Sequence, residues 1–255
     1  YLVGSFHAVI ADERPKRRDH LWVYDMENET ARQVTAEPFD DGDPDMSPDG
    51  RWLVFTSNRT GDDDENNNTD LFVVPADSGE VRRLTVEPGP VRSPAFSPDG
   101  QTVAYTGHKV FNSWAEETDL WVIPFSGGKP LNLTSNFNYS VNGSPVWSRD
   151  GKSLYFTAGI GTDQHLYRVP ASGGRVETVL QADGLLAIMN CDNSGRLWSL
   201  TRTDPMQPAD VYLWEEGAGE LKRLTRMNER LSQFDLARTE LLSWKGAGGF
   251  NVEGV

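Results

Sequence analysis

The chain has 255 residues, with 38 acidic and 24 basic side chains and a formal net charge of −14. This length allows a substantial buried core. The acidic balance argues against binding to nucleic acid or to an anionic membrane, both of which require basic residues. The single cysteine, Cys191, excludes an internal disulfide and favours the cytoplasm as the location. No apolar run approaches the length of a transmembrane helix, and we expect no cofactor.

The first 35 residues predict an incomplete sheet of short strands. Apolar runs over residues 1–10, 21–25 and 31–35 indicate its second, third and fourth strands, and its first strand would precede Tyr1. Residues 11–20 form a charged loop that contains Arg17 and Arg18. We therefore expect the chain to begin inside a repeat.

Four complete repeats follow, over about residues 44–85, 93–134, 143–180 and 186–225. Each contains four short apolar runs, and the first run ends in a tight turn where proline can fix φ and glycine can adopt positive φ. The turn sequences are Ser-Pro-Asp-Gly at 47–50 and 97–100, Ser-Arg-Asp-Gly at 148–151, and a weaker copy at 191–195. Four strands in roughly 40–50 residues are typical of a β-propeller blade, which buries its faces against neighbouring blades.

The segment before each tight turn should be the innermost strand of its blade. Three prolines are expected at the starts of these strands, where a missing backbone donor is tolerated: Pro44, Pro94 and Pro145. Long insertions between second and third strands are expected at residues 58–70 and 107–119. Beyond the last repeat, residues 227–236 predict a turn or short helix, and residues 246–255 predict a further hairpin.

The sequence thus predicts an all-β fold, a β-propeller of four-stranded antiparallel blades. It has four complete blades and partial ones, and it forms a fragment of a larger ring. We assign residues 1–235 to the propeller, incomplete at its N-terminus, and residues 236–255 to a separate segment. The unsealed edges of the first and last sheets predict self-association or an added partner chain.

Several motifs carry a family resemblance that covers essentially the whole chain. They are the blade repeat itself, Ala-Tyr-Thr-Gly-His at 104–108, Lys-Arg-Leu-Thr-Arg-Met-Asn at 222–228, and the segment from Leu242 to Gly254. Together they resemble the non-catalytic propeller of prolyl oligopeptidase-family serine peptidases, in the acylaminoacyl-peptidase and dipeptidyl-aminopeptidase-like branch. Gly248 stands where that family more often has aspartate, so this local turn departs from the pattern.

The resemblance implies a propeller of seven blades, sometimes eight, and makes residues 236–255 the crossing into an α/β-hydrolase domain. That family's nucleophile lies in a Gly-X-Ser-X-Gly turn, which this chain lacks. We therefore predict no catalytic residue here and expect the catalytic domain to follow Val255. The implied role is to cap the active site and filter peptide substrates for the hydrolysis of short peptides. The alternative is a stand-alone Tol-type propeller that acts as a scaffold for protein partners, because such propellers share the blade repeat.

Two loops supply candidate substrate contacts. Glu116 and Glu117 resemble the paired glutamates that hold a substrate's amino group in dipeptidyl peptidases, and two carboxylates suit an ammonium. Arg17 and Arg18 are candidates for holding a peptide carboxylate. The competing interpretations are solvated loops for both pairs and, for the arginines, salt bridges to another domain.

Other clusters give weaker indications. The acidic runs at residues 62–65 and 40–45 offer oxygen ligands suited to calcium, but neither has a known calcium-loop spacing, so we predict no metal site. Tryptophans that recur at blade positions are expected in the core. A carbohydrate-active propeller, the third option, would need several of them exposed together.

Overall fold

Strands are the dominant elements of the computed structural model, which describes residues 17–86, 89–237 and 239–254. Four sheets have four antiparallel strands each, in the order in which the strands follow along the chain. The first has β3 (Asp41–Met46), β4 (Trp52–Ser57), β5 (Asp70–Pro75) and β6 (Arg82–Arg83). The second has β7 (Val91–Phe96), β8 (Thr102–Gly107), β9 (Asp119–Pro124) and β10 (Leu131–Asn132). The third has β11 (Val141–Trp147), β12 (Ser153–Ile160), β13 (Asp163–Pro170) and β14 (Glu177–Leu180). The fourth has β15 (Leu185–Cys191), β16 (Leu197–Asp204), β17 (Gln207–Glu215) and β18 (Lys222–Arg223).

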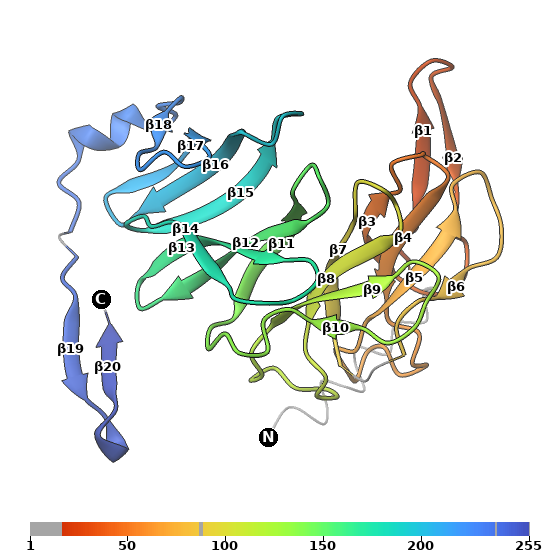
Figure 1. The fold of residues 1–255 in the computed structure, drawn as a ribbon, viewed down its shortest axis with the longest axis horizontal. Coiled ribbons are helices and arrows are strands. Elements are labelled where there is room, and N and C mark those ends of the chain that lie inside the picture. Colours follow the sequence, from red (N-terminus) through yellow and green to blue (C-terminus); the bar gives the residue numbers. More distant parts are fainter. Residues whose placement is uncertain (1–16, 87–88, 238, 255) are drawn as a thin grey trace.

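The sheets follow one another side by side, from orange through green to blue (Figure 1). The first strands of successive sheets contact each other, β3 with β7, β7 with β11 and β11 with β15. Consecutive four-stranded meanders that meet along their first strands are the blades of a propeller. The predicted all-β propeller fold is therefore confirmed, and these four sheets are called blades one to four below.

Shorter elements flank the four blades. β1 (Trp22–Asp25) and β2 (Thr30–Gln33) form a two-stranded sheet before blade one. After blade four come a single 3-10 turn, η1 (Glu229–Gln233), and the hairpin of β19 (Leu242–Lys245) and β20 (Asn251–Gly254), with η2 (Ala247–Gly249) at its tip. The strand predicted for residues 1–10 lies outside the described residues. In the described part of the chain, neither helical turn has the length or apolar character of a membrane span.

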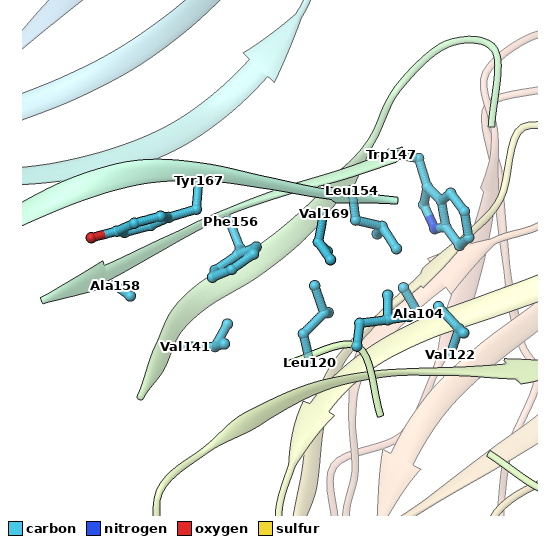
Figure 2. Packing of buried hydrophobic residues seen from close by; sticks show 11 residues of the cluster. Ala104, Leu120, Val122, Val141, Trp147, Leu154, Phe156, Ala158, Tyr167 and Val169 are labelled. Carbon is cyan, nitrogen blue, oxygen red and sulfur yellow. The ribbon is translucent and has the colours of Figure 1, made fainter. Parts of the chain in front are cut away.

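The middle strands of blades one to three are largely buried because both faces of these sheets are covered, whereas β16 and β17 of blade four are only partly buried. Four consecutive residues of β5 and five of β4 are buried. Between blades two and three, Leu120 and Val122 of β9 pack against Leu154 and Phe156 of β12 (Figure 2). Burying a side chain of this size stabilises a fold by about 1.5–3 kcal/mol relative to leaving it exposed. Packing between blades therefore stabilises the fold.

The three prolines lie inside their strands, which corrects the prediction that they start them. β3, β7 and β11 each begin pairing three or four residues before the proline, and the register shifts between those points. The bulges place Asp43 at φ 47°, Ser93 at φ 51° and Gly143 at φ 71°. A bulged residue has no ladder partner, so a proline there removes no hydrogen bond.

Four blade tryptophans are in the core as predicted, Trp52 of β4 is half-buried and Trp22 is exposed. Trp121, Trp147, Trp198 and Trp214 are buried. Trp22 is 59% exposed, although it stands at the same position of its third strand as Trp121 does. It lies in the two-stranded sheet β1–β2, which in the described residues has no second sheet packed over this face.

Candidate binding surface

Loops gather at one end of the blades because of the meander topology. In an antiparallel blade, the connection from the second to the third strand and the connection from the fourth strand to the next blade emerge at the same end. The two long insertions, residues 58–69 and 108–118, are both connections of this kind. We call this end of the blades the loop face.

The two insertions are joined to each other by asparagine side chains. The backbone N–H of Asn112 donates to Asn68 Oδ1 at 3.1 Å, and Asn67 Nδ2 donates to the carbonyl oxygen of Ser113 at 2.9 Å. Asn67 and Asn68 are buried, and Asn112 adopts φ 49°, a left-handed conformation that asparagine tolerates better than most residues. The insertions therefore form one connected structure and not two separate loops.

Glu116 and Glu117 lie in the second insertion. Both are exposed, and within the described residues neither side chain makes a hydrogen bond or an ion pair. Trp114 of the same insertion is 80% exposed, and Phe111 is also exposed. The loop thus presents two carboxylates next to aromatic surface, an arrangement that suits an ammonium group carried on an apolar body.

Arg17 and Arg18 lie elsewhere on the loop face, before β1. Arg18 Nη1 lies 2.8 Å from Asp40 Oδ2 and 2.5 Å from Asp63 Oδ2, and its side chain is largely buried. These hydrogen bonds raise the pKa of the Arg18 guanidinium. Arg18 therefore links the first loop to the first insertion inside this chain, whereas Arg17 is exposed. The structure does not place the arginines beside Glu116 and Glu117.

Arg59 anchors the base of the first insertion, and sequence reasoning missed it. Its guanidinium lies 3.1 Å from Asp41 Oδ1 and 3.4 Å from Glu37 Oε1. It also lies over the ring of Phe72, 4.5 Å from the centroid. The buried carboxylate of Asp41 needs a cationic partner, and Arg59 provides it. No local sequence signal identifies this pair, because Asp41 begins β3 and Arg59 lies 18 residues later in the connection from β4 to β5.

The described residues hold no group of three histidine, cysteine, aspartate or glutamate side chains placed to bind a metal. The acidic runs that suggested calcium are distributed among other partners. Asp40 and Asp63 pair with Arg18, and Asp41 pairs with Arg59. The backbone N–H of Phe96 donates to Asp45 Oδ2 at 2.7 Å and so joins blade one to blade two. Burial raises the pKa of this aspartate.

A cluster of three aspartates on the loop face was also not predicted from the sequence. Asp163 at the start of β13, Asp183 between β14 and β15, and Asp204 at the end of β16 line one cavity. These aspartates are far apart in sequence and belong to no motif. Only the stacking of the two blades brings them together.

Comparison with known proteins identifies the family. The family model described as PD40, TolB beta propeller domain, matches residues 65–202. A Bacillus subtilis (strain 168) protein named uncharacterized peptidase YuxL is 32% identical over 241 residues. That match covers 88% of this chain and 36% of YuxL, so the chain spans about a third of that relative's length.

Solved structures share the fold at low identity. TolB from Acinetobacter baumannii superposes with a TM-score of 0.62 at 19% identity, covering 81% of this chain and 48% of TolB. Acylaminoacyl peptidase from Pyrococcus horikoshii superposes with a TM-score of 0.57 at 14% identity, covering 92% of this chain and 46% of the peptidase. Oligogalacturonate lyase from Vibrio parahaemolyticus superposes with a TM-score of 0.62 at 14% identity, and the match covers 83% of this chain and 61% of the lyase. Propellers with different functions thus share this architecture. Because the family model spans more than half of the sequence, the chain belongs to the PD40 family of TolB-type β-propeller domains.

Proposed function

We propose that this propeller is the non-catalytic domain of a serine peptidase, where it caps the active site and restricts hydrolysis to short peptides. The observation that carries the proposal is the 32% identity to a peptidase over 241 residues. The chain matches 36% of that protein, which leaves ample length there for a catalytic domain. The motifs at residues 222–228 and 242–254, which resemble the exit of such propellers, point the same way.

In this role the loop face would lie toward the catalytic domain and the substrate. The chain leaves blade four at this face, and the hairpin β19–β20 follows. The two joined insertions would form part of the rim that peptides pass. Glu116 and Glu117 would hold the free amino end of a peptide there, and Arg17 would attract its carboxylate end. We also propose a cytoplasmic location, which rests on the near absence of cysteine.

The filter is tested on the intact native polypeptide from the source cells. We expect hydrolysis of short peptides and at least a hundredfold slower hydrolysis of a folded protein with the same cleavable sequence, because a folded chain cannot pass a propeller rim. Equal rates for the two substrates would overturn the filter.

The two glutamates give a sharper test of the same site. In the intact polypeptide, Glu116→Gln with Glu117→Gln should raise KM for a peptide with a free amino end by about tenfold. The acetylated form of that peptide should be unaffected, because it carries no ammonium. Glu27→Gln with Glu80→Gln removes the same charge from exposed turns at the opposite end of the blades and serves as the control. A KM that rises equally for both peptides would exclude amino-end recognition.

The second candidate is a stand-alone scaffold that binds protein partners. The match to TolB propellers favours it. The intact mass of the native polypeptide separates the two candidates. A mass well above 28.4 kDa with labelling by a serine-hydrolase probe supports the peptidase, whereas an unlabelled product near 28.4 kDa supports the scaffold.

A further inference from the structure

A cavity of about 580 Å³ opens on the loop face between blades three and four. Its walls come from the β12–β13 turn, the connection from β14 to β15, and the β16–β17 turn. Leu185, Pro205 and Met206 line it with exposed apolar surface, and Thr239 of the segment after η1 contributes to the lining. The volume lies within the range of small-ligand sites, roughly 300–1,000 Å³.

Three carboxylates and one cation line the same cavity. The cation, Arg202, is already engaged, since its Nε donates to the carbonyl oxygen of Asp183 at 2.7 Å and its guanidinium lies 3.5 Å from Asp204 Oδ2. Asp163 uses one oxygen to accept the backbone N–H of Gly184 at 2.7 Å. The Asp183 carboxylate is exposed and makes no hydrogen bond or ion pair in the described structure. The lining of the cavity therefore carries a net negative charge, and the guanidinium of Arg202 already has partners within the chain.

The negative surface continues into a neighbouring cavity of about 520 Å³. Asp163, Asp183 and Arg202 border both spaces, and Glu220 lines the second one. A ligand in the first cavity would therefore meet both carboxylates and the apolar side chains of Leu185 and Met206.

We propose that this cavity binds a lysine or arginine side chain of a peptide. Such a side chain has a long apolar stem and a cationic head, so the stem would pack on Leu185 and Met206 while the head meets Asp163 and Asp183. An anionic ligand would face uncompensated carboxylates, because Arg202 is committed to its own partners. The site is separate from Glu116 and Glu117, and it goes beyond the proposed filter because it predicts a preference for basic side chains.

The test measures binding to the 255-residue chain by calorimetry, without hydrolysis, so its outcome is independent of whether a peptidase domain exists. The probe is acetyl-leucyl-lysine amide, and its matched partner is the same peptide acetylated at the lysine Nε atom. We expect the charged peptide to bind about tenfold more tightly than its neutral partner, with a preference that weakens as salt rises. Backbone N–H resonances of Thr162, Gly184 and Thr203 should shift on binding.

Variants locate the site. Asp163→Asn with Asp183→Asn should abolish the preference for the charged peptide, and the asparagine oxygen at 163 can still accept from Gly184. Asp183→Asn alone, at an exposed side chain that makes no hydrogen bond or ion pair among the described residues, should reduce the preference about threefold. The control, Glu27→Gln with Glu80→Gln, changes the net charge by the same amount and should leave the preference for the charged peptide intact. Equal binding of the two peptides, or a preference that survives the Asp163 and Asp183 changes, would overturn the proposal.

Discussion

At the residue scale, a serine and an aspartate define the tight turn that recurs in the blades. Ser47 Oγ donates to Asp49 Oδ1 at 2.6 Å and accepts the backbone N–H of Trp52 at 2.9 Å. Gly50 adopts φ 71°, which glycine reaches without strain. The same bonds recur at Ser97 and Ser148, whereas in blade four Asp192 replaces the serine and accepts the N–H of Leu197.

These turns predict a loss of stability in acid. Hydrogen bonds from Ser47, and then from Arg51, lower the pKa of Asp49 to about 2, and bonds from Ser194 and Leu197 do the same for Asp192. An unfolded aspartate has a pKa of about 3.9. A pKa lowered by folding gives stability that is present above about pH 4 and is lost as the pH falls toward 2.

Asp49→Asn tests this linkage, because the asparagine cannot titrate. We expect the free energy of unfolding of the variant, measured in urea between pH 4 and pH 2, to fall less steeply than that of the wild type. Asp77→Asn, at an exposed aspartate that accepts the backbone N–H of Ser78 and lies outside these tight turns, is the control. Identical slopes for Asp49→Asn and the wild type would contradict the assignment.

At the element scale, an aspartate–threonine pair ties the third strand of a blade to the end of its fourth. In blade two, Thr134 Oγ1 donates to Asp119 Oδ1 at 2.6 Å and accepts the N–H of Leu120 at 2.9 Å. Blades one and four repeat these bonds with the pairs Asp70–Thr85 and Asp210–Thr225. The fourth strands β6, β10 and β18 have only two residues each, so this side-chain pair supplements a very short ladder.

Thr134→Val should therefore destabilise the chain by about 2–3 kcal/mol. Valine has the same shape but leaves the Leu120 N–H, at a fully buried residue, without its acceptor. Urea denaturation measures the free energy of unfolding of each variant. Thr30→Val, at an exposed position of β2, is the matched control and should change stability by less than about 0.5 kcal/mol. A loss at Thr134 as small as that at Thr30 would show that the pair contributes nothing.

At the scale of the whole molecule, neighbouring blades depend on each other. The core between blades two and three draws Leu120 from one and Phe156 from the other (Figure 2). Trp147 of β11 donates its Nε1–H to the carbonyl oxygen of Ala95 in β7 at 3.0 Å. Between blades three and four, Arg149 Nη2 donates to the carbonyl oxygen of Cys191 at 2.9 Å. Each blade thus completes the core and hydrogen bonds of the next.

Phe156→Ala should cost about 3–5 kcal/mol, because it leaves a cavity at a fully buried position between two blades. Hydrogen exchange should show lost protection in β8 and β9 as well as in β12. Phe234→Ala, at a side chain that is 65% exposed, is the control and should have little effect. Loss of protection confined to blade three would contradict the coupling between blades.

The strand order, the tight turns and the blade repeat could all be predicted from the sequence, because they depend on residues that are close together in the chain. Ser97, Asp99 and Gly100 form one turn, and their spacing alone predicts it. The prediction that Pro44, Pro94 and Pro145 start their strands was wrong, because the register of a strand depends on its partner strand. Which residues come together at the candidate sites is visible only in the tertiary structure. Arg18 meets Asp63 across 45 residues, Asn67 meets Ser113 across 46, and Asp163, Asp183 and Asp204 meet at the junction of two blades. Contacts of this kind arise when blades stack, and no local pattern encodes which loops then become neighbours.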